Sequence, residues 1–272
     1  MEQGGYRSLR IPAVLCITLA AVVLGGGLFW PLDPLAMDFT TTLAAPSLAH
    51  PMGTDATGRD VLARFLAGGR LSLLVGTVVM FGGLVPGALL GLLAARTGGA
   101  LDLILMRIID GIAAFPPILL AMAVAIGLGG GLWTAVLGVA ISTLPFYARL
   151  MRSEVLRVQS YPFVEAAESM GASPGFILVW HIAPHAGSTM LVQSASVFGY
   201  AIITLAGLGF VGLGAQIPTP EWGVMITGGM QYALTGQWWL TIFPGFGILF
   251  AVVAANLLAD RLSDVLGGRG DA

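Results

Sequence analysis

Six long apolar stretches constrain this 272-residue chain more than any other feature. Each is long enough to cross a hydrocarbon core about 30 Å thick, which takes roughly 20 residues of helix. Charged residues make up only 10% of the chain, against about 25% in an average soluble domain. We therefore predict an all-α polytopic membrane protein. Its six transmembrane helices are expected at residues 11–30, 71–95, 103–126, 132–150, 190–213 and 240–258.

The distribution of arginine predicts the orientation of these helices. All 12 basic residues are arginine, and with the N-terminus inside, nine lie at or near the cytoplasmic side and three outside. This excess is typical of cytoplasmic loops, and tryptophan is typical of membrane interfaces. Both termini are therefore predicted to be cytoplasmic. Five tryptophans fall near the outer ends of the spans: Trp30, Trp133, Trp222, Trp238 and Trp239.

The same pattern divides the chain into four parts. The first span is too long for the core of a signal peptide, and no small-residue cleavage site follows it, so we interpret it as a retained anchor. The parts are an N-terminal tail with this anchor (1–30), an external segment (31–70), a five-helix core (71–260) and a cytoplasmic tail (261–272).

The external segment is predicted to contain one short amphipathic helix. Val61, Leu62, Phe65 and Leu66 would share one face of it. Such a helix would lie on the outer membrane surface. Alternatively, it would shape the entrance seen by an external protein that delivers substrate.

One long polar interruption, at residues 147–187, is where the chain can meet water and a soluble partner. Pro162 suits the first turn of a helix, which would run through residues 165–170 until Gly171 stops it. Residues 173–174, Ser-Pro, are typical of the start of a second helix, and Pro184 is expected to end that helix. We predict a short acidic helix held crosswise between two spans, which transmits force to another subunit.

The third span carries two charges and a proline pair. Arg107 and Asp110 are three residues apart, and charges in a span usually pair, so we expect a structural ion pair between them. Phe115, Pro116 and Pro117 should kink or break the helix. This break is a candidate for a cavity or hinge, with Phe115 and Pro116 as possible gate or path residues.

The fifth span is rich in glycine. Close helix packing explains its glycines as well as a gate does. Leu205, Gly207 and Gly209 are therefore further candidates for a gate or path, and they carry little weight alone.

No catalytic or cofactor site is predicted in this chain. A phosphate-binding P-loop needs a lysine, and the sequence has none, so any ATP that drives transport must be hydrolysed by another polypeptide. One cysteine excludes an internal disulfide bond. His181 and His185 have the spacing of a metal-binding pair, but Pro184 between them breaks the helical register, so no metal site is predicted.

Four ordered blocks carry a family resemblance. Residues 165–167 (Glu-Ala-Ala), Gly171 and residues 182–184 (Ile-Ala-Pro) closely resemble the EAA loop of ABC-importer permeases. Residues 50–60, 210–223 and 256–260 add blocks similar to the second permease subunit of dipeptide, oligopeptide and nickel importers. The resemblance covers nearly the whole chain from about residue 31.

This resemblance implies a type I ABC-importer permease fold with a cytoplasmic coupling helix. That helix would dock in a groove of the ATP-hydrolysing subunit through Glu165, Ala166, Ala167, Gly171 and Pro184. The implied partners are a homologous second permease, one or two ATP-binding subunits that hold ATP and Mg²⁺, an external substrate-binding protein and the lipid bilayer, but no nucleic acid. The implied location is the inner (plasma) membrane of a prokaryote.

Some positions depart from the family pattern. His185 replaces a common asparagine and Ala183 a common leucine. Residues 205–207, Leu-Ala-Gly, stand where many peptide-type members have a glutamate. Together with residues 222–225, Trp-Gly-Val-Met, this looks more like nickel-type members. The expected cargo is therefore short peptides or nickel chelates.

Two other classes of protein fit the sequence less well. A stand-alone secondary transporter or channel would show inverted repeats and ionisable residues near the midplane, and no clear repeat is present. An intramembrane enzyme would need a nucleophile with a base, or a metal motif, inside a span, and the sequence shows neither.

Overall fold

The computed structural model describes residues 14–267 apart from 16, 20, 24 and 28. The described part is helical and contains no strand, only a single bridge between Thr54 and Asp60. In order, the elements are η1 (Phe39–Thr41), α2 (Val61–Thr97), α3 (Gly99–Ala113), α4 (Pro117–Gly127), α5 (Leu132–Gln159), α6 (Pro162–Ser169), α7 (Pro174–Ile177), the π-helical turn η2 (Leu178–Ile182), α8 (Ala183–Phe210), α9 (Trp222–Ala233) and α10 (Trp239–Gly267).

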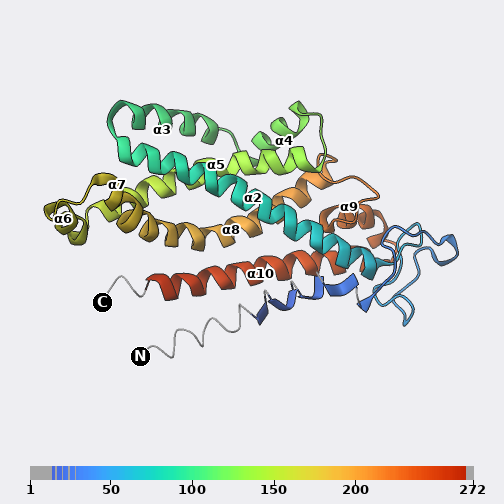
Figure 1. The fold of residues 1–272 in the computed structure, drawn as a ribbon. Coiled ribbons are helices and arrows are strands. Elements are labelled where there is room, and N and C mark those ends of the chain that lie inside the picture. Colours follow the sequence, from blue (N-terminus) through green and yellow to red (C-terminus); the bar gives the residue numbers. More distant parts are fainter. Residues whose placement is uncertain (1–13, 16, 20, 24, 28, 268–272) are drawn as a thin grey trace.

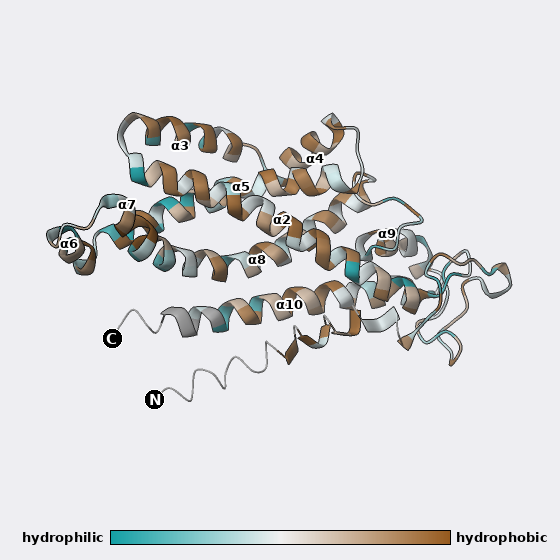
Figure 2. Cartoon of the chain, viewed as in Figure 1, coloured by the Kyte–Doolittle hydropathy of each residue, from teal (hydrophilic) through white to brown (hydrophobic). Residues whose placement is uncertain are grey.

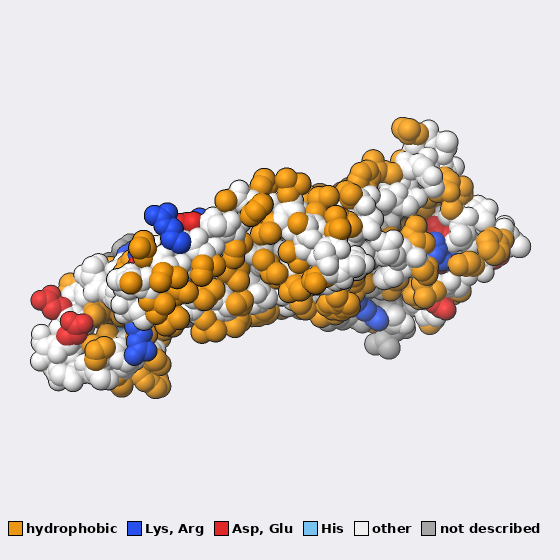
Figure 3. All heavy atoms as spheres, turned by 90° about the horizontal axis from the view of Figure 1, so that it is seen from above, with side chains coloured by type: hydrophobic (Ala, Val, Ile, Leu, Met, Phe, Trp, Pro, Cys, Tyr) orange, Lys and Arg blue, Asp and Glu red, His pale blue; other side chains and the backbone are white. Residues whose placement is uncertain are grey.

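The long helices lie along one axis and give the molecule two distinct ends (Figure 1). One end carries α6 and α7, and we call it the α6 end. The opposite end carries α9 and the segment at 31–60, and we call it the α9 end. Most of the helical ribbon is coloured as hydrophobic (Figure 2). In the space-filling view, apolar side chains cover the middle of the molecule, and charged side chains gather toward its ends (Figure 3).

Within the described residues, four helices are long and apolar enough to cross a membrane. They are Val61–Thr97, Leu132–Gln159, Pro174–Phe210 and Trp239–Arg261, and they confirm the spans predicted at 71–95, 132–150, 190–213 and 240–258. The bent pair α3 and α4 makes a fifth span if the two are counted together. Much of the first predicted span, 11–30, lies outside the described residues; its described positions from 14 to 29 are helical.

The predicted break in the third span is confirmed. α3 ends at Ala113, α4 begins at Pro117, and their axes differ by 87°. Pro116 is extended, with φ −53° and ψ 128°, because the following proline disfavours helical backbone at the residue before it. The span at 103–126 is therefore two short helices.

The short amphipathic helix expected within residues 31–70 is the first part of α2, so the boundary at residue 70 falls inside a continuous helix. Asp60 starts α2 by accepting a hydrogen bond from the backbone N–H of Ala63 at 2.7 Å. Val61 and Leu66 are buried inside the protein rather than facing a membrane surface. The same amphipathic pattern fits both places, because either one buries a single face.

Glycines on α2 let its backbone approach that of α5. A Cβ atom at Gly87 would lie 2.7 Å from the Cβ of Tyr147, and one at Gly91 would lie 2.3 Å from the carbonyl oxygen of Ala148. Gly83, Gly87 and Gly91 recur every fourth residue, the spacing that brings small residues to one helix face. Small residues are typical of helix interfaces in membranes.

Among the described residues, three clusters of buried apolar side chains follow the bundle axis, and α8 contributes to each. Met190 and Val197 join the cluster nearest the α6 end, which also holds Tyr147 and Val164. Leu205 and Leu208 join the second cluster with parts of α2, α4 and α5. Ile202 joins the third with Trp222 of α9.

Candidate functional site

α6 is attached to the bundle by one apolar stripe. Val164 and Ala167, three residues apart, are 3% and 4% exposed and belong to the cluster at the α6 end. Glu165, Ala166 and Glu168 are exposed to solvent. Ala167, predicted to contact a partner, therefore packs inward and holds the helix in place, while its neighbours form an exposed acidic face.

Gly171 ends α6 as the sequence predicts. It has φ +82°, a left-handed conformation that glycine adopts without steric cost. Its N–H donates to the carbonyl of Glu168 at 2.9 Å, and the N–H of Ala172 donates to the carbonyl of Ala167 at 3.1 Å. These two bonds make a Schellman motif, which satisfies carbonyl groups left over at the end of the helix.

The second helix also begins as predicted, but it does not end at Pro184. The Ser173 hydroxyl accepts from the N–H of Phe176, and Pro174 is the first helical residue. The chain then continues through η2, where the N–H of Ala183 donates to the carbonyl of Leu178. Pro184 is exposed near the start of α8. A proline lacks the N–H for a bond four residues back, and the wider π-helical turn accommodates that gap.

Aromatic and imidazole rings join α6 to the start of α8. The ring of Phe163 stacks on His185 with centroids 5.2 Å apart, and Phe176 meets His181 edge-on at 5.8 Å. The Nδ1–H of His185 donates to the carbonyl oxygen of His181 at 2.7 Å. Both imidazoles therefore act in packing. Among the described residues, no group of three or more His, Cys, Asp or Glu side chains is placed to hold a metal.

Ion pairs fasten α5 to its neighbours near the α6 end. Arg152 binds Asp102 of α3 through two bonds, of 2.7 Å and 2.6 Å. Glu154 accepts from Arg157 and from the hydroxyl of Thr189 on α8. α5 is thereby linked to both α3 and α8.

The ion pair predicted between Arg107 and Asp110 is replaced by another one. The carboxylate of Asp110 lies 3.7 Å from the guanidinium of Arg149 on α5, and both side chains are about half exposed. Within the described part of the chain, Arg107 makes no ion pair. The neighbouring α5 supplies the partner of Asp110, which spacing within α3 alone cannot reveal.

The predicted gate residues do not meet in one place. Phe115 is 59% exposed at the break next to Pro116, whereas Leu205 is 4% exposed inside the second cluster. A Cβ atom at Gly207 would have no neighbour within 4 Å, and one at Gly214 would lie 2.9 Å from Gly209. The absence of a side chain at Gly214 thus lets the chain pack closely on Gly209 where it turns after α8.

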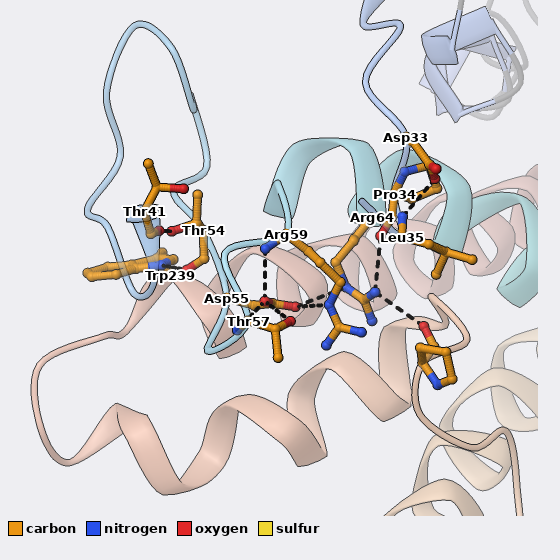
Figure 4. A network of polar contacts seen from close by, with 11 residues as sticks. Asp33, Pro34, Leu35, Thr41, Thr54, Asp55, Thr57, Arg59, Arg64 and Trp239 are labelled. Carbon is orange, nitrogen blue, oxygen red and sulfur yellow. Dashed lines mark hydrogen bonds and ion pairs between the residues drawn. The ribbon is translucent and has the colours of Figure 1, made fainter. Parts of the chain in front are cut away.

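Sequence reasoning missed a charged cluster at the α9 end (Figure 4). Asp55 accepts from the Nε–H of Arg59 at 2.7 Å and lies 3.6 Å from the Nε of Arg64. Arg64 also donates to the carbonyl oxygens of Pro34 and Pro218, both at 3.2 Å. Four charges within ten residues, in a chain so poor in charge, were the available signal.

Comparison with known proteins is consistent with this architecture. Residues 87–269 match the family model described as binding-protein-dependent transport system inner membrane component. A probable D,D-dipeptide transport system permease protein of Escherichia coli (strain K12) is 44% identical over 86% of this chain and 78% of that protein. A dipeptide transport system permease protein of Alkalihalophilus pseudofirmus is 42% identical over 82% of this chain and 73% of its own.

Two further similarities extend the comparison. A glutathione transport system permease protein of Pectobacterium atrosepticum is 42% identical over 84% of this chain and 76% of its own. The MetNI methionine ABC transporter, solved in an inward facing conformation, has a chain with a TM-score of 0.62. That match covers 76% of this chain and 97% of the other at 21% identity, and it supports the fold alone.

Membership follows from the family model, which spans more than half of the chain, and from relatives above 40% identity over most of both sequences. The family is non-catalytic, and ATP hydrolysis occurs in a partner ATPase. This chain belongs to the family of binding-protein-dependent transport system inner membrane components and is a multi-pass permease subunit of an ABC importer.

Proposed function

We propose that this chain forms half of the translocation path of a binding-protein-dependent importer of short peptides and docks on the ATP-hydrolysing subunit through α6. The observation that carries this proposal is the exposed face of Glu165, Ala166 and Glu168 on a helix held by Val164 and Ala167. A polar face on a firmly seated helix can bind a partner without first having to be ordered.

The proposed assembly contains partners beyond this chain. A homologous second permease supplies the other half of the path, and an external binding protein delivers the substrate. One or two ATP-binding subunits hold ATP and Mg²⁺. The lack of lysine in this chain supports this division of labour, because a P-loop needs that residue.

Contacts between α6 and α8 provide a route for force from a docked partner into the bundle. Phe163 of α6 stacks on His185 of α8, and the buried Val164 shares a cluster with Met190 and Val197 of α8. A partner that moves α6 would therefore also move α8, which traverses the bundle. Closure of the ATP-binding subunits would in this way alter the path between its inward-open and outward-open states.

In this proposal the α6 end is cytoplasmic and the α9 end external, with both chain termini on the cytoplasmic side of the inner membrane. Arg149, Arg152 and Arg157 lie on the part of α5 that leads into α6. Cytoplasmic segments next to spans carry such an excess of arginine.

Short peptides are favoured as cargo over nickel chelates. The names of the three relatives concern dipeptides or glutathione. Part of the sequence clue for nickel rested on residues 205–207, yet Leu205 is only 4% exposed inside an apolar cluster.

The test is substrate-stimulated ATPase activity of the complete complex, reconstituted with its binding protein. The stimulation by short peptides is compared with the stimulation by nickel chelates. Peptides should stimulate the wild type. Glu165→Arg should lower this stimulation at least tenfold, about 1.4 kcal/mol of coupling, or release the ATPase subunit. Asp260→Arg, which reverses an exposed charge on α10, is the matched control and should behave as wild type.

Three results would overturn parts of this proposal. Normal assembly and stimulation in Glu165→Arg would remove α6 from the interface. Stimulation by nickel chelates alone would replace the cargo. Uptake by this chain without any ATPase subunit would favour a stand-alone secondary transporter or channel.

A further inference from the structure

A cavity of about 240 Å³ lies at the α9 end. One wall is charged and comes from the turn before α2 and its first residues: Asp55, Arg59 and Arg64. The facing wall is largely apolar and comes from α9 and the preceding loop: Ile217, Val224, Met225, Gly228 and Tyr232. The cavity thus combines an apolar wall with a compact charged wall.

The charged wall carries an excess positive charge. Among the described residues that line the cavity, Asp55 is the only acid, and it faces two guanidinium groups (Figure 4). Burial raises the pKa of Asp55, but hydrogen bonds from Thr57 and Arg59 lower it further, so its net pKa is below the usual value. Asp55 is therefore ionised at neutral pH, and the three groups together carry one net positive charge.

Among the described residues, one terminal nitrogen of Arg64, Nη1, has structural partners, whereas both terminal nitrogens of Arg59 lack one. Arg64 donates to Pro34 and Pro218 and so ties the turn to two loops. The Arg59 side chain is only 9% exposed, and its one side-chain hydrogen bond is from Nε to Asp55. Within the described part of the chain, neither terminal nitrogen of Arg59 has a hydrogen-bond partner.

Those terminal nitrogens are accessible to solvent on a residue that lines the cavity. Among the described residues, no side-chain nitrogen or oxygen is both sealed from solvent and without a hydrogen-bond partner. The terminal nitrogens of Arg59 therefore remain accessible, and Arg59 lines the cavity. A guanidinium group presents its donors in a planar fork, which matches the two oxygens of a carboxylate.

We propose that this cavity binds the C-terminal carboxylate of a short peptide, with the terminal guanidinium nitrogens of Arg59 as the donors. The inference rests on the proposed function and adds a binding site to it. The volume suits one end of a peptide, since a cavity of about 150 Å³ already holds a benzene molecule. The apolar wall would take the adjoining side chain, and the carboxylate would balance the excess charge.

The test compares two probes on the complete complex without its external binding protein: the dipeptide alanyl-phenylalanine and its C-terminal amide. Direct binding to the wild type should favour the free carboxylate at least tenfold. Arg59→Gln should reduce affinity for the free acid to that for the amide and change amide binding less than twofold. The effects of the substitution and of amidating the probe would then not add. Such non-additivity identifies a direct contact between Arg59 and the carboxylate, because independent effects would add.

A second variant leaves the charged wall intact. A Cβ atom at Gly228 would meet no atom within 4 Å, so Gly228→Leu can fill the cavity without a clash at its first carbon. It should weaken binding of both probes at least tenfold. Gly111→Leu is the matched control, since Gly111 lies on α3, has equally open surroundings and does not line the cavity.

The outcomes separate this inference from the proposed function. A wild-type complex that imports peptides but binds both probes equally, or whose binding is unchanged in Gly228→Leu, would refute the cavity site and leave the function standing. A wild-type complex that imports no peptide would refute both. If Arg59→Gln left the binding of both probes unchanged but weakened docking of the external binding protein in a separate assay, the partner of Arg59 would be an acidic side chain of that protein and the peptide site would be refuted.

Discussion

Replacing Gly171 with alanine isolates the backbone contribution to the position of α6. Gly171 has φ +82°, and an added Cβ would meet no atom within 4 Å, so alanine introduces no clash. The remaining effect is the free-energy cost of placing an L-amino acid in the left-handed backbone conformation, about 1–2 kcal/mol. A change of that size raises an opening equilibrium roughly 5- to 30-fold. Gly171→Ala should therefore let α6 detach that much more often.

Amide hydrogen exchange measures this effect directly. In the reconstituted complex, exchange at residues 163–170 should accelerate roughly 5- to 30-fold in Gly171→Ala. Gly171→Asn should lie between alanine and wild type, because asparagine enters the left-handed region more readily. Gly175→Ala is the matched control: its surroundings are equally open and its φ is not positive. Unchanged exchange in Gly171→Ala would refute the claim that this turn holds α6.

Two further predictions concern packing and pH. Gly91→Ala should destabilise the α2–α5 interface by about 1–3 kcal/mol, since the new Cβ would lie 2.3 Å from the backbone oxygen of Ala148. A lower Tm in Gly91→Ala than in the control Gly111→Ala would confirm this destabilisation. Asp55 has a folded-state pKa below 3.8, so its stabilisation is complete above about pH 3.8 and is lost as pH falls through the lower, folded value. Trp239, whose Nε1–H donates to the carbonyl of Thr54, should report that loss by fluorescence, and Asp55→Asn should abolish this pH dependence.

Features set by length or by a single turn could be predicted from the sequence. The long helices follow from apolar stretches matched to the hydrocarbon thickness. The end of α6 at Gly171 and the start of α7 at Ser173 follow from local backbone chemistry, as does the break before Pro117. Each of these depends on neighbours in the chain, and the sequence displays those neighbours.

Features set by contacts across the fold could not be predicted. Asp110 pairs with Arg149 because α5 lies beside α3, and no spacing within α3 indicates that. Ala167 points inward and Ala166 outward, although two adjacent alanines look the same in the sequence. The cavity beside Arg59 exists only because α9 folds against the start of α2, more than 150 residues earlier, as the bond from Trp222 to the carbonyl of Phe65 shows.

α8 connects the proposed docking helix with the proposed peptide site. At one end, His185 stacks on Phe163 of α6. Toward the other end, α8 approaches α9 so closely that a Cβ atom at Gly223 would lie 2.5 Å from the Cα of Ala206. The next residues of α9, Val224 and Met225, line the cavity. A displacement of α6 along this chain of close contacts would therefore move one wall of the cavity relative to Arg59. Because coupling between two binding sites is reciprocal, a carboxylate held by Arg59 would in turn bias the position of α6.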